Sequence, residues 1–219
     1  FLMFCLHPDV FSQKNKKQNE QKIKFGDVTA ADFAPAFYAV DSGAQAVILY
    51  DAGLSRYEGN TNGWFSIIYK KHIRIRLMNK NSFDELSTVK IALYTSSTYE
   101  EKMQNFHAAT YNIQGGAVAA TKVDKSSLFK EKDGNTTILK FTFPNVSEGC
   151  IIEYDYELYL PGYRDIRTWY FQGKYPRLWS EYTFECPEFF DFVFLPQGYI
   201  PYVLDTAIYS RQTFNLSSG

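Results

Sequence analysis

The sequence has few of the residues that would cross-link a small fold or hold a metal ion. Only three of its 219 residues are cysteine, and no CxxC motif or Cys/His spacing typical of zinc sites occurs. If Cys5 is removed with a leader, Cys150 and Cys186 could form one disulfide or remain as two buried thiols. A chain of this length can bury a core without cross-links. Because no Cys/His spacing suggests a zinc site, we expect no metal, and we expect no cofactor.

An excess of charge of either sign is also absent. The 23 basic and 24 acidic residues give a net charge of −1, and the longest basic cluster is the short KNKK at residues 14–17. Nucleic-acid binding needs a clustered basic face, so we exclude nucleic acid as a partner. No run of about 18 apolar residues follows the N-terminal segment, which predicts no transmembrane segment.

The N-terminal residues have the order of a signal peptide. An apolar stretch is followed by a polar one, and Val10 and Ser12 suit the −3 and −1 positions of a cleavage site. We therefore expect residues 1–12 to be a signal-peptide remnant and the protein to be exported, periplasmic or on the cell surface. Phe4 precedes Cys5 where a lipobox needs a small residue, which disfavours lipidation. The alternative is a partly buried N-terminal segment of a cytosolic protein.

Aromatic residues are abundant, with 19 Phe and 17 Tyr, and favour strands because they pack well on a pleated surface. From Ala44 onward the dominant period is two. Glycine pairs or Asp-Gly predict two hairpins, at 115–116 and 133–134. Helix is expected only after Thr29, which lies three residues before Asp32 as in a capping box, and as a turn in EEKMQNF. The fold predicted is all-β, an antiparallel β-sandwich of about ten strands or an open barrel.

The predicted strands can be placed on the chain by their sequence. They are AQAVILYD, FSIIYKKHIRIRLMNK, STVKIALYT, the two hairpins, FTFPNVSEGCIIEYDYELYL, TWYFQGKYP, SEYTFECP, DFVFLP and YVLDTAIYS. The polar residues 13–28 are a lead-in, and no linker interrupts the following pattern. We predict one β-sandwich domain over residues 29–210, with residues 211–219 beginning a connection to a downstream domain.

Three carboxylates at every second position raise the question of an acid site. Glu153, Asp155 and Glu157 would leave one face of a strand at a spacing near that of the two acids of an inverting glycosidase. The same period also describes the solvent-facing side of a strand, which is the interpretation we favour. The basic row of residues 72, 74 and 76 has matching spacing, so we hypothesise that the two strands are antiparallel neighbours with opposed charges.

Aromatic side chains offer a second class of function. Trp169, Trp179 and Tyr182 lie close together in the sequence, and exposed aromatic platforms stack sugars in many carbohydrate-binding sandwiches. Large aromatic residues also fill cores, and this simpler interpretation is the one we favour. A glycan-binding protein should expose at least one of Trp64, Trp169 and Trp179.

Nucleophilic catalysis finds little support. Cys150 opens a predicted strand and Cys186 precedes a proline, whereas a reactive thiolate needs a helix N-terminus or a neighbouring imidazole. Hence we assign no catalytic residue to this chain.

Several blocks together resemble a known family. They are AVILYD, HIRIRLMNK, ATYNIQGGAV, FTFPNVSEGCIIEYDYEL and WYFQGKYPRLWSEYTFECPEFF, which occur in this order over residues 40–205. They are similar to a bacterial domain of unknown function that precedes transglutaminase-like domains of papain type in exported proteins. Cys150 stands where that family usually has a small residue such as Ser.

This resemblance implies a non-catalytic accessory module that positions or shields a downstream transglutaminase-like domain of the same chain. It assigns no catalytic residues. Two alternatives remain open: a sandwich that binds carbohydrate or peptidoglycan, with cell-wall or dietary polysaccharide as partner, and a hydrolase that uses Glu153 with a second carboxylate.

Overall fold

The computed structural model describes residues 23–34, 43–193, 195, 197–198, 201–203, 205–211 and 213. The expected signal-peptide remnant, Cys5 and most of the polar lead-in lie outside these residues. So does most of the expected connection at residues 211–219.

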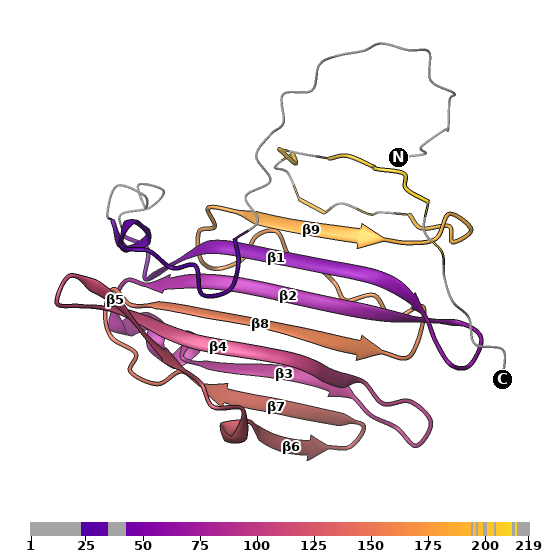
Figure 1. Ribbon diagram of the computed structural model, residues 1–219, viewed down its shortest axis with the longest axis horizontal. Helices are drawn as coiled ribbons and strands as arrows, with labels where there is room; N and C mark the ends of the chain where they lie inside the picture. Colours follow the sequence, from indigo (N-terminus) through magenta and orange to yellow (C-terminus); the bar gives the residue numbers. More distant parts are fainter. Residues whose placement is uncertain are drawn as a thin grey trace, which may run out of the picture.

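The described residues form an all-β sandwich, as predicted from the sequence. Its nine strands are β1 (Ala46–Gly59), β2 (Phe65–Leu77), β3 (Thr88–Tyr94), β4 (Lys102–Gln114), β5 (Ala117–Lys122), β6 (Phe129–Asp133), β7 (Thr136–Thr142), β8 (Ile151–Leu160) and β9 (Ser180–Glu185). One sheet has the order β5-β4-β8-β2-β1-β9 and the other β3-β7-β6. Neighbouring strands are antiparallel except β1 and β9, which are parallel (Figure 1).

The two predicted hairpins are present because glycine supplies the backbone conformation that their turns need. Gly115 and Gly116, between β4 and β5, have φ values of 57° and 82°. Gly134, between β6 and β7, has a φ of 56°. Such positive φ values at the centre of a two-residue turn match the twist of the flanking strands.

Helix is confined to short pieces within the described residues. These are η1 (Ala30–Phe33), η3 (Lys80–Ser82), α1 (Phe83–Leu86) and η4 (Lys125–Ser127). The expected helix start is confirmed at η1, where the Thr29 backbone N–H donates to the Asp32 carboxylate at 2.7 Å. None of the helices in the described part of the chain is long and apolar enough to cross a bilayer.

Two local predictions are wrong. EEKMQNF is not a helical turn, because most of it forms the beginning of β4. TWYFQGKYP, DFVFLP and YVLDTAIYS contain no strand among their described residues, and an isolated bridge to Ile48 occurs only at Arg177, just after the first of them. Aromatic composition alone suggested strands there, but a strand also needs ladder hydrogen bonds, which Pro176 cannot donate.

The sheets pack against each other through aromatic side chains. The Phe141 ring of β7 lies 4.7 Å from the Phe106 ring of β4 and 5.7 Å from the Tyr154 ring of β8. Ile152, Leu158 and Leu160 of β8 join the same core, as their alternation predicted. Complete burial of one such side chain contributes roughly 1.5–3 kcal/mol.

The smaller sheet covers only part of the inner face of the larger sheet, and irregular segments cover the rest. Phe190 stacks on Tyr57 of β1 at 4.6 Å between ring centroids. Trp169 lies so close to Gly53 of β1 that a β-carbon there would be 2.5 Å from the indole. Figure 1 shows β1 and β9 on the side of the molecule away from β3, β7 and β6. The segments after β8 therefore complete the core without forming strands.

The outer face of the larger sheet is also partly covered. Phe25, Val28 and Phe33 pack against Tyr111 and Ile151, which are buried. This second cluster lies on the side of β8 opposite to the main core, because side chains alternate along a strand.

Gly53→Ala should destabilise the protein by about 1–3 kcal/mol, because the added β-carbon would also lie 2.9 Å from the Tyr182 ring. Urea unfolding followed by fluorescence measures this change. Gly173→Ala is the matched control, since its β-carbon would meet only the flexible end of the Arg177 side chain. Equal stability of the two variants would contradict the packing described.

Candidate functional site

The carboxylate row and the basic row lie on neighbouring antiparallel strands, as hypothesised. Arg74 of β2 is opposite Glu153 of β8, and His72 is opposite Asp155. The third basic residue, Arg76, is opposite Ile151 instead of an acid, and Glu157 is opposite Lys70.

Glu153 is not on a solvent-facing surface, so that prediction is wrong for this residue. Its side chain is 0% exposed. One oxygen, Oε1, accepts hydrogen bonds from Arg74 Nε and Nη2 at 3.0 and 2.8 Å and from His72 Nε2 at 2.8 Å. The other, Oε2, accepts from Tyr111 Oη at 2.8 Å and from the Gly26 N–H at 3.0 Å. Both oxygens are therefore fully used.

Opposing effects act on the pKa of Glu153. Burial is the largest, and it raises the pKa because it disfavours the charged form. The His72 hydrogen bond, the charge of Arg74 and the Gly26 N–H lower it, and together they hold the pKa below the ordinary value. The carboxylate thus stays ionised and out of reach of solvent. This geometry favours a structural role over that of a general acid or base.

The other two carboxylates are more exposed and also paired. Asp155 accepts a hydrogen bond from His107 Nδ1 at 2.7 Å, and that imidazole is about half exposed. Phe25 lies between the two histidine rings, 5.5 Å from His107 and 6.3 Å from His72. Among the described residues, His107 thus pairs with Asp155 and packs against Phe25.

A second buried charge cluster lies on the inner face and was not predicted. Asp51 of β1 is 1% exposed, forms an ion pair with Arg177 and lies 3.1 Å from Lys71 Nζ. The Lys71 ammonium is 4.4 Å from the centre of the Trp169 ring. Burial lowers the pKa of Lys71 to about 8. The signal in the sequence is that residues 51, 53 and 55, which share one face of the strand, are Asp, Gly and Ser instead of large apolar residues.

The three aromatic candidates do not form one platform. Trp169 and Tyr182 stack at 5.4 Å with an interplanar angle of 18°, on the inner face beside Gly53. Trp179 is 37% exposed, and its indole donates to Glu181, which alternates onto the opposite face from Tyr182. The structure therefore separates Trp179 from the other two.

Trp64 is the most exposed tryptophan, at 47%. It packs edge-on against Phe65 and Tyr163 at the β1–β2 turn. Trp179 is beside Asp51, because the Asp51 N–H donates to the Trp179 carbonyl. Asp51 lies eight residues before Gly59, the end of β1 near Trp64, and eight residues of strand span roughly 26 Å. The two exposed indoles could not contact the same sugar ring.

The two described cysteines are free thiols and do not form a disulfide. Cys150 is 1% exposed, and burial raises its pKa, which disfavours the thiolate. Cys186 is exposed, and its pKa is also raised by desolvation. No group of three or more His, Cys, Asp or Glu side chains that could hold a metal ion occurs in the described part of the chain.

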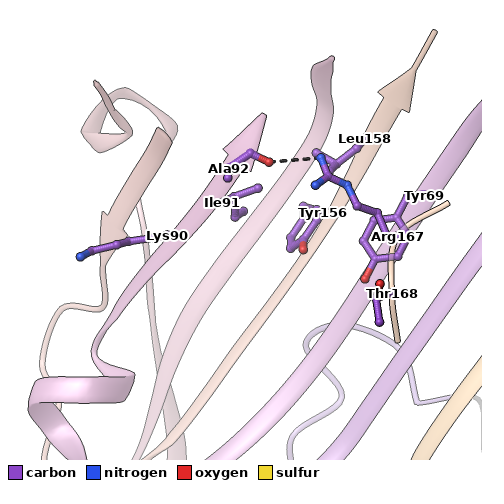
Figure 2. Close-up of a pocket in the computed structure, with 8 residues that line it drawn as sticks. All are labelled: Tyr69, Lys90, Ile91, Ala92, Tyr156, Leu158, Arg167 and Thr168. Carbon is purple, nitrogen blue, oxygen red and sulfur yellow. Dashed lines mark hydrogen bonds between the residues drawn. The ribbon is translucent and has the colours of Figure 1, made fainter. Parts of the chain in front are cut away.

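A cavity of about 170 Å³ lies between β3 and the inner face of the larger sheet (Figure 2). Its walls include Tyr69, Ile91, Tyr156, Leu158, Arg167 and Thr168. Arg167 Nη2 donates to the Ala92 carbonyl at 3.2 Å and forms an ion pair with Glu101. Burial raises the pKa of Tyr156, so its hydroxyl remains protonated at neutral pH. Sequence analysis identified neither the cavity nor Arg167.

Comparisons with known proteins give no assignment. No protein-family model matches the chain, and no curated protein matches it. One similar solved structure is a protein from Parabacteroides distasonis ATCC 8503 that was proposed to be a protease; it is 12% identical, with a TM-score of 0.43 over 54% of this chain and 24% of that one. This chain thus spans about a quarter of the length of that protein. A similarity this low does not transfer a function.

Glu153→Gln should destabilise the protein by about 3–5 kcal/mol, because it removes the buried partner of the Arg74 charge and leaves only the partly exposed Asp32 carboxylate, 3.9 Å away. The difference from the wild type should be largest above pH ~4.3, the ordinary Glu pKa, and should shrink as the pH falls through the lower folded pKa. Chemical denaturation at a series of pH values measures it.

Glu157→Gln serves as the control, since its partner Lys70 is 44% exposed and such pairs contribute at most about 1 kcal/mol. A Glu153→Gln variant as stable as this control would show that the buried pair does not support the fold.

Proposed function

We propose that this chain is a non-catalytic accessory module of an exported protein, and that it positions or shields a transglutaminase-like domain of the same polypeptide. The proposal starts from the sequence blocks that resemble the domain preceding such enzymes. The observation that carries it is a concentration of exposed apolar side chains near the C-terminal end of the described residues.

Seven of the large apolar side chains that are exposed lie between residues 189 and 209. They are Phe189, Val193, Leu195, Tyr202, Val203, Ile208 and Tyr209, and their exposed fractions range from 44% to 95%. Exposed apolar residues scattered singly are ordinary, whereas a contiguous patch of them marks an interaction surface, and these seven lie within 21 residues of the chain. A domain that packs against this segment would remove these side chains from water.

The state of the chemically capable groups supports a non-catalytic role. Glu153 uses both oxygens within the protein, and Cys150 is buried with a raised pKa. Neither group is available to a substrate in this conformation. The charge pairs of the larger sheet instead hold its strands together, which suits a rigid support for another domain.

Amide hydrogen exchange tests the proposal by comparing the 219-residue chain with the longer polypeptide encoded by its gene. Amides between residues 193 and 209 should exchange at least tenfold more slowly in the longer polypeptide, because the second domain covers them. Val203→Asp in the longer polypeptide should remove this protection, whereas Ile113→Asp, at an exposed apolar position of β4, should not. A gene that encodes no second domain, or equal exchange in both forms, would overturn the proposal.

A second candidate function is carbohydrate binding, which the exposure of Trp64 and Trp179 favours. Each indole could stack on one sugar ring of a cell-wall or dietary polysaccharide. Their separation suits a long polymer better than a short oligosaccharide.

Titration with peptidoglycan fragments or plant glycans should then shift the tryptophan fluorescence of the wild-type chain. Trp64→Ala or Trp179→Ala should weaken binding at least fivefold, since each substitution removes the indole on which a sugar ring would stack. Trp169→Phe is the control, because the Trp169 ring is stacked against Tyr182. Unchanged spectra with every glycan, or no loss in either exposed variant, would reject this function.

A further inference from the structure

Strand β3 is an edge strand with one open side. It pairs only with β7 in the order β3-β7-β6. The Phe143 N–H donates to the Ser87 carbonyl, so Ser87 and every second residue after it bond to the β7 side. Antiparallel alternation then directs the backbone groups of Lys90 and Ala92 to the opposite side.

Part of this open side already has partners. At the end of the strand, the Tyr94 carbonyl accepts a hydrogen bond from the Glu101 N–H, and the Tyr94 N–H donates to the Glu101 carboxylate. The Ala92 carbonyl accepts a hydrogen bond from Arg167. The N–H and carbonyl of Lys90 and the N–H of Ala92 have no hydrogen-bond partner within the described ranges. Unpaired backbone groups on an extended strand are a template for another strand.

The cavity lies beside this open stretch. Figure 2 shows Tyr156 and Leu158 of β8 beside Ile91 and Ala92, with the Arg167 side chain extending to the Ala92 carbonyl. An added strand would direct the side chain opposite Ile91 toward this space, since residues opposite each other share a face. The volume of about 170 Å³ is close to that of a cavity on the order of 150 Å³ that accepts a benzene ring. One apolar side chain would fit.

The charge at the edge indicates what kind of strand would bind. Lys90 is exposed and lies opposite Lys140 of β7. Lys140 forms an ion pair with Glu131, and the more distant charge of Lys90 also lowers the pKa of that carboxyl, but Lys90 forms no ion pair of its own among the described residues. Like charges directly opposite each other are unfavourable, so a carboxylate on the open side of Lys90 would be stabilising.

We infer that the open edge of β3 binds an extended acidic peptide by strand addition. The peptide places a carboxylate beside Lys90 and an apolar side chain over Tyr156 and Leu158, and its backbone bonds to Lys90 and Ala92. A second copy of this chain is a poorer occupant, because antiparallel pairing through both open residues would place each Lys90 opposite Ala92 of the other copy and diagonal to its Lys90 on the same face, where the like charges repel. This inference is independent of the proposed function.

A phage-displayed library of random dodecapeptides selected on the 219-residue chain tests the inference. Selected peptides should alternate acidic and apolar residues, and hydrogen exchange should show protection of the Lys90 and Ala92 amides when a synthetic copy is added. Ala92→Pro should weaken binding at least tenfold, because it removes the outward N–H while leaving the bonds to β7 intact. Ala92→Ser retains the N–H and is the matched control. Lys90→Glu should change the selected peptides from acidic to basic.

Three outcomes would overturn the inference. Selection could yield no binding peptide, or the selected peptides could bind Ala92→Pro as tightly as the wild type. Light scattering could also show that the chain alone dimerises with these two amides protected, which would identify a second copy as the occupant. Circular dichroism of Ala92→Pro checks that a loss of binding is not caused by a loss of folding. If Ala92→Pro unfolds, the change in the charge of the peptides selected on Lys90→Glu tests the inference instead.

Discussion

The arrangement of the larger sheet depends on the buried pair of Arg74 and Glu153. These side chains are 2% and 0% exposed, and a shift of β8 by one residue would move the carboxylate to the other face. The buried guanidinium would then lose its closest carboxylate and keep only the Lys24 carbonyl and the more distant Asp32, at a cost of several kcal/mol. The same carboxylate accepts from His72, Tyr111 and Gly26, so it connects β2, β4 and the N-terminal segment to β8. The register of β8 against β2 is thus coupled to the packing of the N-terminal segment on the outer face of the sheet.

The unequal width of the two sheets explains most of the remaining features. Three strands cannot cover six, so irregular segments after β8 cover β1 and β9. Irregular backbone brings polar groups into the core, where Arg177 pairs with Asp51. It also requires a position without a β-carbon, which Gly53 supplies beneath Trp169. Where the cover ends beside β3, the cavity and the open backbone groups remain.

Local patterns predicted what depends on local geometry. Alternation identified β2 and β8, and their matching charges predicted that these strands pair, as Arg74 and Glu153 do. The covering of Glu153 could not be predicted, because period two assigns residues to faces but does not say which face is covered. The Gly26 N–H that bonds Glu153 lies 127 residues away in the sequence. Aromatic richness around Trp169 likewise predicted strands where the ladder hydrogen bonds are missing.

The charge of Lys90 has two consequences at the open edge of β3. Lysine on an exposed edge strand commonly opposes pairing between identical chains, because two copies would place like charges together. The same charge attracts a strand that carries carboxylates. Arg167 does not add to this attraction, because it is paired with Glu101 and its guanidinium occupies the Ala92 carbonyl, where a strand N–H would otherwise donate. An edge strand that was only protected against pairing with other chains would need no cavity beside it. Here Tyr156 and Leu158 leave room for one side chain beneath the position of an added strand. The combination of repulsion between copies and space for a different strand therefore favours selective pairing over simple protection.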